Sequence, residues 1–444
     1  MIYSGKKAVV LGLGHSGEAA ATLLREEGAD VTVCESNDNP GLRAKAEALA
    51  AQGIPVLLGA AADTDPAIYD VCVLSPGIDP VVELVQNVIR KKIPIIGELE
   101  LAFEECICPT VAITGTNGKT TTTELTTAML QGSGVRTMAS GNIGLPFATA
   151  VRQSQELDVM VLEVSSFQLE TIKAFHPHVA VWLNLSPNHL DRYRDIDEYR
   201  TAKLRIFENQ TEEDFAVLNA REELPENKAK KITFSAYTQE ADFTLRDGVI
   251  YFRGEPILDQ GKTKLPGIHN AENLMAALAV GVALNVDFDR MVAAVMDYTA
   301  PAHRCEFVRN FEGVRWINDS KATNLDAMEK AILSHPGSLI LVAGGKDKGV
   351  EFDPIAPLVR ERVQLAVLIG EMKDRIAKSW NGVDCRIAGS LEEAVQIARA
   401  EAKSGDTILF SPGTSSYDMF RNYGERGNRF KDLVNALSTT TTDS

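Results

Sequence analysis

The sequence predicts an α/β protein with a Rossmann-like N-terminal domain, a central P-loop domain that binds a mononucleotide, and a Rossmann-like C-terminal domain. At 444 residues the chain is long enough for about three domains. Short apolar runs alternate with helical patterns, which is typical of α/β folds. Two glycine-rich turns, at residues 12–17 and 115–118, each follow an apolar run and precede a helix pattern. We expect the domains to comprise residues 1–97, 98–300 and 301–444.

The composition is that of a folded, acidic protein. Hydrophobic residues make up 45% of the chain, which is enough for several cores. The net charge of −16 argues against nucleic acid as a partner, because nucleic-acid binders need a basic surface. No run of about 18 apolar residues predicts a membrane span, and no apolar signal-peptide region opens the chain. The six scattered cysteines are expected to be reduced thiols, which favours a cytoplasmic protein.

The predicted N-terminal domain begins with a strand at residues 7–11, and the pattern G-x-G-x-x-G at 12–17 then opens a helix. A second strand ends at Glu35, and a third, at 71–74, runs into Ser75-Pro76-Gly77. The glycines and the later acidic residue suit a dinucleotide, and they suit equally any diphosphate-ribose bound at a helix N-terminus. The glycines also fit the alternative that they only permit close helix packing.

The stretch around the second glycine-rich turn organises the central domain. Residues 111–113 form an apolar run, the turn follows, and residues 120–130 have a helix pattern. The free N–H groups of the turn and the positive helix end suit a phosphate, and Lys119 adds a point charge. The hydroxyl of Thr120 is placed to reach Mg²⁺. Ile113 stands where the general P-loop pattern has its first glycine, and a purely structural glycine turn is the less favoured alternative.

Polar side chains follow several further predicted strands. Glu163 follows one strand of the central domain, and His189 lies shortly after another. Because ligands bind at the carboxyl ends of strands in open α/β sheets, both should reach the bound phosphates or their metal. In the C-terminal domain, ordinary turns explain Asp319 together with Lys321 less well than a site does. Strands are expected at 157–163, 179–184, 214–218, 314–317, 339–342, 366–369 and 407–410, short strands within 230–264, and a helix at 270–284.

Several short motifs are distributed over the chain. They are Gly115-Thr116-Asn117-Gly118-Lys119-Thr120, Gly141-Asn142-Ile143-Gly144, Glu163-Val164-Ser165-Ser166-Phe167-Gln168-Leu169, His189-Leu190-Asp191-Arg192, Lys203-Leu204-Arg205, His269-Asn270, His303-Arg304 and Asn318-Asp319-Ser320-Lys321-Ala322-Thr323-Asn324. With these motifs, the chain resembles along essentially its whole length the Mur ligases, the ATP-dependent amide-forming enzymes of peptidoglycan synthesis. Within the family it is most similar to the members that add D-glutamate, on residues 166–170, 319–324 and 411–427. It lacks the Asp-Asn-Pro-Arg signature of the diaminopimelate-adding members, and Asn188 replaces the family's more common acidic residue.

The resemblance implies a ligase that uses ATP to convert the carboxylate of UDP-N-acetylmuramoyl-L-alanine into an acyl phosphate, which the amine of D-glutamate then attacks. It also implies two Mg²⁺ ions and a carbamate formed from CO₂ on Lys203. We expect a monomer. We also expect the C-terminal domain to move on ligand binding about a hinge near residues 299–302, because the ATP phosphates would bind at Lys119 and the ribose at Asp319.

The resemblance also assigns roles to individual residues. Two lysines in the amino-acid site suit a ligand with two carboxylates. The acidity of Glu35 would also fit a nicotinamide dinucleotide. Asn270 could also cap its helix. The implied residues are Lys119, His189 and Lys203 for catalysis; Gly115, Thr116, Asn117, Gly118, Lys119, Thr120, Thr121, Asn270, Asn273, Arg304 and Asp319 for ATP; Thr120, Glu163, His189 and Lys203 for metal; His15, Ser16, Glu35, Ser36, Gly77 and Asn142 for the UDP-substrate; and Lys321, Thr323, Lys348, Ser416 and Tyr423 for D-glutamate.

Three other functions compete with this interpretation. A folylpolyglutamate-type ligase would share the P-loop and the carbamylated lysine, but the turn at 12–17 speaks against it. A dinucleotide-dependent oxidoreductase is suggested by residues 8–35 alone and leaves residues 109–124 unexplained. A P-loop regulatory ATPase does not explain why candidate site residues follow strands of both later domains. ATP turnover that requires an amino acid would favour the ligase.

Overall fold

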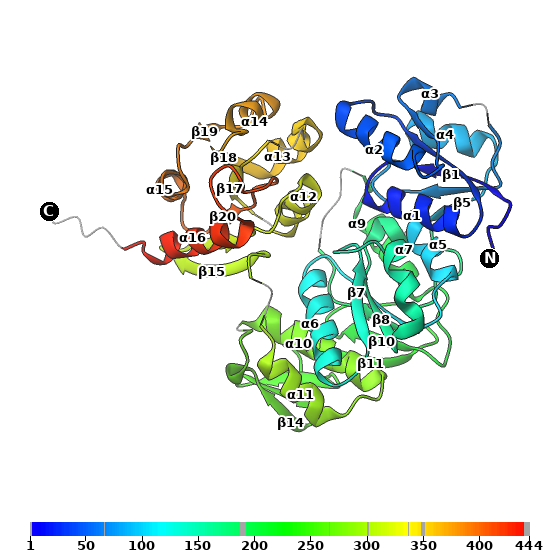
Figure 1. The fold of residues 1–444 in the computed structure, drawn as a ribbon. Coiled ribbons are helices and arrows are strands. Elements are labelled where there is room, and N and C mark those ends of the chain that lie inside the picture. Colours follow the sequence, from blue (N-terminus) through cyan, green and yellow to red (C-terminus); the bar gives the residue numbers. More distant parts are fainter. Residues whose placement is uncertain are drawn as a thin grey trace. The chain divides into compact units, whose positions relative to one another are not determined.

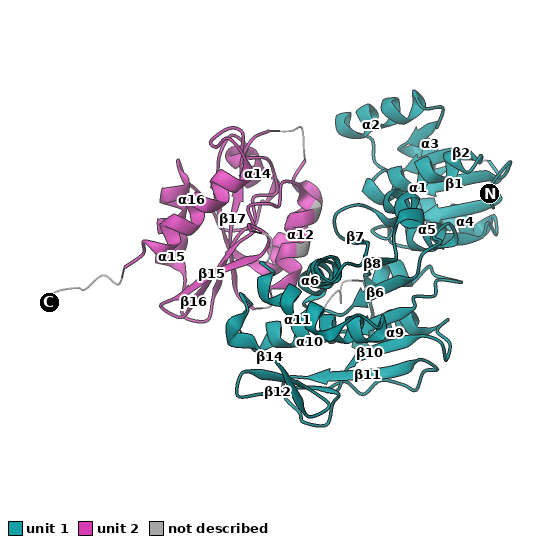
Figure 2. Ribbon diagram, turned by 60° about the horizontal axis from the view of Figure 1, so that its bottom comes forward, with its two compact units in different colours: residues 1–300 teal, residues 301–444 magenta. Residues whose placement is uncertain are grey.

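The computed structural model describes residues 2–65, 67–186, 192–265, 267–299, 302–335, 337–347 and 351–438. The chain forms two compact units, unit 1 with residues 1–300 and unit 2 with residues 301–444 (Figure 2). Within the described residues, unit 1 contains two sheets and unit 2 contains one (Figure 1). None of the helices in these ranges is long and apolar enough to cross a membrane.

The first sheet of unit 1 is parallel throughout, with the strand order β3-β2-β1-β4-β5. Because β1 pairs with both β2 and β4, the turns after these three strands lie at one edge of the sheet. Apolar side chains cover both faces of β1, with Val10 in one core cluster and Val9 in another. The elements are β1 (Lys7–Leu11), α1 (His15–Glu26), β2 (Asp30–Glu35), α2 (Pro40–Ala50), β3 (Val56–Leu58), α3 (Ala60–Asp63), β4 (Val71–Leu74), α4 (Glu83–Arg90) and β5 (Ile95–Gly97).

The second sheet of unit 1 has nine strands in the order β14-β13-β12-β11-β10-β9-β6-β8-β7. It is parallel except for the antiparallel pairs β12–β13 and β13–β14. Helices α6 and α10 pack against each other on one face (Figure 1). The elements are α5 (Glu98–Glu104), β6 (Thr110–Thr114), α6 (Lys119–Gly132), β7 (Thr137–Gly141), α7 (Phe147–Ala150), η1 (Val151–Glu156), β8 (Val159–Glu163), α8 (Ser166–Leu169), β9 (Val179–Trp182), α9 (Ile196–Leu204), η2 (Arg205–Phe207), β10 (Phe215–Asn219), β11 (Lys230–Ser235), β12 (Phe243–Arg246), β13 (Val249–Phe252), β14 (Glu255–Asp259), η3 (Gln260–Lys262), α10 (Ile268–Ala283) and α11 (Phe288–Asp297).

The sheet of unit 2 has the order β15-β16-β20-β17-β18-β19, in which only the β15–β16 pair is antiparallel among the described strands. Its two faces are covered by separate core clusters, one around Trp316 and Phe430 and one around Met328 and Trp380. The elements are β15 (Glu306–Phe311), β16 (Val314–Asn318), α12 (Leu325–Ser334), β17 (Leu339–Gly344), η4 (Asp353–Ile355), α13 (Ala356–Arg362), β18 (Val363–Ile369), α14 (Lys373–Ser379), β19 (Cys385–Ile387), α15 (Leu391–Glu401), β20 (Thr407–Phe410) and α16 (Tyr423–Asn435).

The structure corrects several predicted element bounds. Helix α10 begins at Ile268, so Asn270 lies inside its first turn and does not cap the helix. The residue before the helix is Gly267, whose φ of 91° other residue types do not adopt readily. Strand β9 ends at Trp182, which leaves Asn184 in the following loop. The sequence pattern does not predict the three-residue strands β3, β5 and β19 or the strands β7 and β15, because short strands and strands with several polar residues show too little apolar alternation.

Candidate functional site

The predicted strand, glycine turn and helix around Lys119 are present as β6, residues 115–118 and α6. Gly115 lies so close to the chain after β9 that a Cβ atom would come within 2.9 Å of the Leu183 Cβ atom. Gly118 has a φ of 85°, and a Cβ atom at this position would lie 2.7 Å from Oδ1 of Asn273. Both positions therefore require glycine for close approach as well as for backbone conformation.

Asn184 holds the shape of this phosphate loop. Its Oδ1 accepts the N–H of Asn117 at 2.8 Å, and its Nδ2 donates to the carbonyl of Asn117 at 3.0 Å. The N–H of Thr116 donates to the Asn184 carbonyl, and the Thr116 hydroxyl bonds the backbone of Ser186. Sequence reasoning did not select Asn184, although a polar residue just beyond a neighbouring parallel strand is the signal that could have found it.

Lys119 lies over the loop in this structure. Its Nζ donates to the carbonyls of Gly115 and Thr116, each at 3.0 Å. An anion bound by the backbone of the loop would therefore lie close to the Lys119 ammonium. Thr121, two residues after Lys119, is partly buried in the first turn of α6.

Glu163, Thr120 and Asn142 come together at the carboxyl ends of β8 and β7 and the start of α6. The Thr120 hydroxyl donates to Glu163 Oε2 at 2.7 Å, and Asn142 Nδ2 donates to Glu163 Oε1 at 2.7 Å. The pairing of β7 with β8 places Gly141 opposite Glu163, which brings Asn142 to this position. The arrangement gathers carboxylate and hydroxyl oxygens, which are the hard ligands that Mg²⁺ prefers.

Lys203, near the end of α9, is only 1% exposed. Its Nζ donates to the Gly115 carbonyl at 2.9 Å, lies 3.4 Å from Thr114 Oγ1, and lies 4.8 Å from the centroid of the Tyr199 ring. Burial lowers the pKa of Lys203 well below its usual value, and the nearby charge of Lys119 lowers it further. Both effects shift the protonation equilibrium of Lys203 toward the neutral amine.

Asn273 lies against the phosphate loop from α10. Its Oδ1 accepts the Thr122 hydroxyl at 3.1 Å, and its Nδ2 donates to Asn270 Oδ1 at 3.3 Å. Two other predicted site residues, His189 and Lys348, lie outside the described residues.

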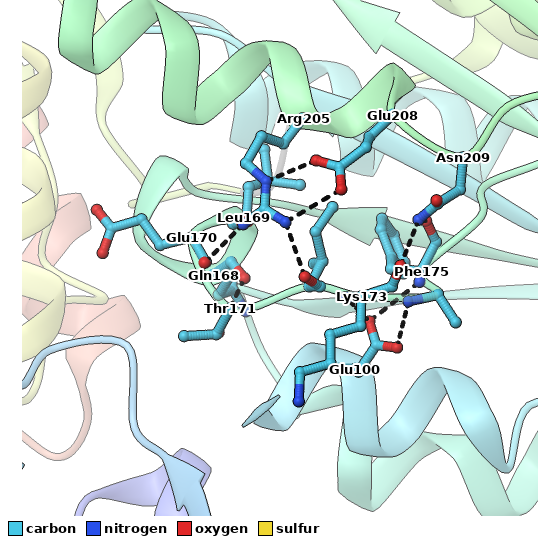
Figure 3. A network of polar contacts seen from close by, with 12 residues as sticks. Glu100, Gln168, Leu169, Glu170, Thr171, Lys173, Phe175, Arg205, Glu208 and Asn209 are labelled. Carbon is cyan, nitrogen blue, oxygen red and sulfur yellow. Dashed lines mark hydrogen bonds and ion pairs between the residues drawn. The ribbon is translucent and has the colours of Figure 1, made fainter. Parts of the chain in front are cut away.

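The chain between the Glu163 strand and the Lys203 helix is held by two charged side chains, those of Glu100 and Arg205 (Figure 3). Glu100, from α5, is fully buried and accepts three backbone N–H groups, those of residues 173–175, at 2.6–3.0 Å. Arg205 donates to the carbonyls of residues 169, 170 and 172 at 2.6–2.8 Å. Since Arg205 directly follows α9, these bonds connect the Lys203 helix to the end of α8. Sequence reasoning assigned no role to either charge.

The predicted UDP-substrate residues other than Asn142 lie at one edge of the first sheet, while Asn142 lies beside Glu163 in the second sheet. A Cβ atom on Gly17 would come within 2.0 Å of the Gly12 carbonyl, so this turn also needs its glycine. Glu35 Oε2 accepts the N–H of Leu13 at 3.1 Å, which ties this carboxylate to the glycine turn. Ser36 donates to Asp63 at 2.6 Å. His15 and Gly77 are exposed and Ser16 is partly buried at the same edge.

In unit 2, Asp319 follows β16 and is almost completely buried. Its Oδ2 accepts the Ser411 hydroxyl at 2.7 Å, and its Oδ1 accepts the N–H of Cys305 at 3.1 Å. Burial raises the pKa of Asp319 to about 6, although these hydrogen bonds and the charge of Arg304 oppose the rise. The carboxylate is thus ionised above about pH 6 and can accept hydrogen bonds.

Arg426, which sequence reasoning missed, joins the loops that carry the predicted D-glutamate residues. This buried guanidinium donates to the Ser320 hydroxyl at 3.0 Å, to the Ser320 carbonyl at 2.9 Å and to the Thr414 carbonyl. The Ser320 hydroxyl donates in turn to the Tyr423 carbonyl at 2.9 Å. Burial lowers the pKa of Arg426 to about 10. Three other predicted residues lie on these loops, with Lys321 and Thr323 half-buried and Ser416 buried.

The parallel sheets and the phosphate loop define an α/β nucleotide-binding protein. Three family models match it in chain order: the N-terminal domain of MurD-like Mur ligases at residues 6–97, the Mur ligase middle domain at 113–281, and the Mur ligase glutamate ligase domain at 303–413. The predicted three-region α/β fold is confirmed by these matches together with the sheets.

Relatives match the chain over nearly its whole length. The UDP-N-acetylmuramoylalanine–D-glutamate ligase of Geobacter metallireducens is 43% identical over 99% of this chain and 99% of its own. The protein of the same name from Geotalea uraniireducens is 41% identical over 97% of this chain and 98% of its own. The chain therefore belongs to the Mur ligase family, among its UDP-N-acetylmuramoylalanine–D-glutamate ligases, and the resemblance noted from the sequence is confirmed.

Solved structures support the fold. A UDP-N-acetylmuramate-alanine ligase from Thermotoga maritima superposes with a TM-score of 0.50 at 18% identity, covering 97% of this chain and 99% of its own. A murein peptide ligase from Psychrobacter arcticus superposes with a TM-score of 0.52 at 16% identity, covering 98% of this chain and 100% of its own. At these identities the likeness concerns the fold alone.

Proposed function

We propose that this protein is the ATP-dependent ligase that joins D-glutamate to UDP-N-acetylmuramoyl-L-alanine in peptidoglycan precursor synthesis. The observation that carries the proposal is that Lys119 contacts the backbone of the phosphate loop while the adjacent Thr120 bonds Glu163. Relatives of 41–43% identity that bear this activity in their names support it. We further propose that the protein works in the cytoplasm as a monomer and that its domains are residues 1–97, 98–300 and 301–444.

The proposed reaction has two steps. A carboxylate oxygen of the UDP-substrate attacks the γ-phosphorus of ATP, and ADP leaves. The amine of D-glutamate then attacks the acyl carbon, loses a proton, and displaces phosphate to leave an amide. Because the transferring group carries most of the charge, the protein acts chiefly by positioning and by electrostatic stabilisation.

Lys119 is proposed to bind the β- and γ-phosphates. Its ammonium would exchange the carbonyls of Gly115 and Thr116, to which it donates in this structure, for phosphate oxygens. The backbone turn and the N-terminus of α6 supply the remaining positive potential. Asn270, Asn273, Arg304 and Asp319 are proposed to hold the adenine and ribose, with the ionised Asp319 accepting a ribose hydroxyl.

Thr120 and Glu163 are proposed to hold one Mg²⁺ ion, and the second is assigned to His189 and Lys203. The two oxygens of the Thr120–Glu163 pair already lie 2.7 Å apart, and their chemistry fits this ion. When bound, Mg²⁺ neutralises phosphate charge. Asn142, which bonds the same carboxylate, would then turn its amide toward the acyl group of the UDP-substrate.

Lys203 is proposed to carry a carbamate. The lone pair of its neutral amine would attack the carbon of CO₂, and the nitrogen would lose a proton to give a carbamate anion. The depressed pKa of the buried amine supports this, since an ammonium has no lone pair to react. The positive charge of Lys119, whose influence already reaches this amine, would stabilise the product anion.

The two remaining substrates are proposed to bind at the strand ends described above. His15, Ser16, Glu35, Ser36 and Gly77 would contact the uridine and its phosphates. For D-glutamate we propose two lysines for the carboxylates and three further polar residues around them, which are Lys321, Lys348, Thr323, Ser416 and Tyr423.

A phosphate-release assay tests the proposal. With ATP, Mg²⁺ and UDP-N-acetylmuramoyl-L-alanine present, we expect phosphate release to depend on an added amino acid and to be fastest with D-glutamate among a panel of D- and L-amino acids. Preference for another amino acid would contradict the assigned specificity. Release that does not require the UDP-substrate would contradict the ligase.

A further inference from the structure

Arg192 links two segments of unit 1 that the proposed reaction must hold together. Its guanidinium donates to the carbonyl of Pro76 at 3.1 Å and to Glu170 Oε2 at 2.7 Å. Pro76 belongs to the turn of residues 75–77 after β4, which carries part of the proposed UDP-substrate site. Glu170 follows α8, a few residues after Glu163 of the proposed metal site. One side chain therefore connects the substrate turn to the segment that follows the metal site.

The contacts of Arg192 restrict its orientation. The side chains of Arg192 and Glu170 are 13% and 23% exposed, so their ion pair is largely shielded from solvent. The guanidinium carbon lies 4.3 Å from the centroid of the Phe167 ring, and the second oxygen of Glu170 accepts the hydroxyl of Tyr193. A planar cation that is stacked, paired and hydrogen-bonded at once has few alternative conformations, unlike an exposed surface ion pair.

Aromatic rings continue this link to the phosphate loop. The ring of Phe167 stacks on Tyr193 with centroids 5.8 Å apart, and Tyr193 lies 5.3 Å from Tyr199. The Tyr199 hydroxyl is 3.4 Å from Thr116 Oγ1, and the Tyr199 ring lies beneath the amine of Lys203. The aromatic rings that pack beneath Arg192 therefore extend to the loop that is proposed to bind ATP.

We propose that Arg192 and Glu170 are positioning residues that hold the 75–77 turn in the conformation that receives the UDP-substrate. This inference rests on the proposed function. A turn that is already ordered loses less conformational entropy when the ligand binds, so the affinity for the UDP-substrate depends on the pair. The affinity for ATP does not, because the phosphate loop is held by Asn184 and its neighbours.

Calorimetric titration of the full chain tests this, with UDP-N-acetylmuramoyl-L-alanine and a non-hydrolysable ATP analogue as separate ligands. We expect Arg192→Ala to weaken binding of the UDP-substrate about tenfold or more, as for loss of hydrogen bonds to a charged group, while the ATP analogue binds as before. The affinity of Arg192→Lys for the UDP-substrate should lie between those of the unaltered protein and Arg192→Ala. Lysine keeps the charge but cannot bond both acceptors in the planar geometry of arginine.

Glu170→Gln separates positioning from direct contact, since within the described residues it is Arg192 that connects Glu170 to the turn. We expect Glu170→Gln also to weaken binding of the UDP-substrate. The variant with both Glu170→Gln and Arg192→Ala should lose less binding free energy than the sum of the two single losses. Arg194→Ala is the matched control, because this neighbouring arginine is 84% exposed and pairs with Glu198 in the first turn of α9. It should leave both affinities unchanged.

Two outcomes overturn the inference: unchanged affinity for the UDP-substrate in folded Arg192→Lys and Arg192→Ala, or equal weakening of both ligands, as a general loss of structure would cause. If the unaltered protein fails to bind the UDP-substrate, the proposed function fails first and this inference falls with it. The thermal unfolding temperature of each variant shows whether the protein is folded.

Discussion

At the scale of single residues, Lys119 places its ammonium against the backbone of the proposed phosphate loop. We predict that Lys119→Ala abolishes ATP-dependent ligation while the fold survives, because removing a charge aimed at the transferring group costs several kcal/mol of barrier, or about 10³-fold in rate. Phosphate release measures the rate, and circular dichroism monitors the fold. Lys228→Ala removes an exposed lysine of the same unit and should be neutral. Near-normal turnover in Lys119→Ala would refute the assignment.

Lys203 is the residue whose chemistry depends most on its surroundings. We predict that the protein incubated with ¹³C-bicarbonate shows a carbamate carbon resonance that Lys203→Ala lacks, because burial lowers the pKa of the amine and so shifts it toward the reactive neutral form. The alanine variant should regain part of its activity with a short-chain carboxylic acid, which can replace the carbamate in the vacated space. Full activity of Lys203→Ala without such an acid, or an identical resonance in both proteins, would contradict the prediction.

At the scale of elements, α5 begins with an acid in an apolar environment. Glu98 is 2% exposed, and its Oε1 accepts the N–H of Ala148, in the first turn of α7, at 2.6 Å. The other oxygen has no hydrogen-bond partner among the described residues. Burial raises the pKa of Glu98 to about 7 from an ordinary value of 4.5. The charged form therefore destabilises the folded state, and stability is expected to fall as pH rises from about 4.5 to about 7.

We predict that Glu98→Gln stabilises the protein at pH 8 by on the order of 2 kcal/mol, because glutamine can still accept the Ala148 N–H but never ionises. At pH 5 the carboxyl is mostly protonated in the folded protein, so the difference should be much smaller. Thermal unfolding of both proteins at the two pH values measures this. A difference of equal size at pH 5 and pH 8 would show that burial of the charge is not its cause.

At the scale of the whole molecule, the residues proposed for ATP are divided between unit 1, with Lys119, and unit 2, with Asp319. We predict that an ATP analogue together with the UDP-substrate lowers the radius of gyration, because closure would exclude water from an acyl phosphate that hydrolyses. Solution scattering with and without the ligands measures this. The hinge is predicted near residues 299–302, of which 300 and 301 lie outside the described residues. An unchanged radius and unmoved inter-domain distance labels would rule closure out.

The sequence by itself determined the class of fold and the position of the phosphate loop. Strand β6, the glycines at 115 and 118 and the start of α6 are contiguous, and their pattern follows from local sterics and the hydrogen-bonding needs of a helix end. The same holds for the turn at 12–17 after β1. Short strands such as β5 escaped prediction, because three residues cannot show a period.

Only the tertiary structure decided which groups meet and which are deprived of water. Asn184 and the phosphate loop are 67 residues apart in sequence, and Arg426 and Ser320 are 106 apart. Nothing in the neighbourhood of Lys203 along the chain indicates that it is 1% exposed. Hydrogen-bond geometry between distant segments depends on strand register and helix packing, and a pKa depends on the desolvation that those segments impose. Local sequence encodes neither, because both are properties of the assembled core.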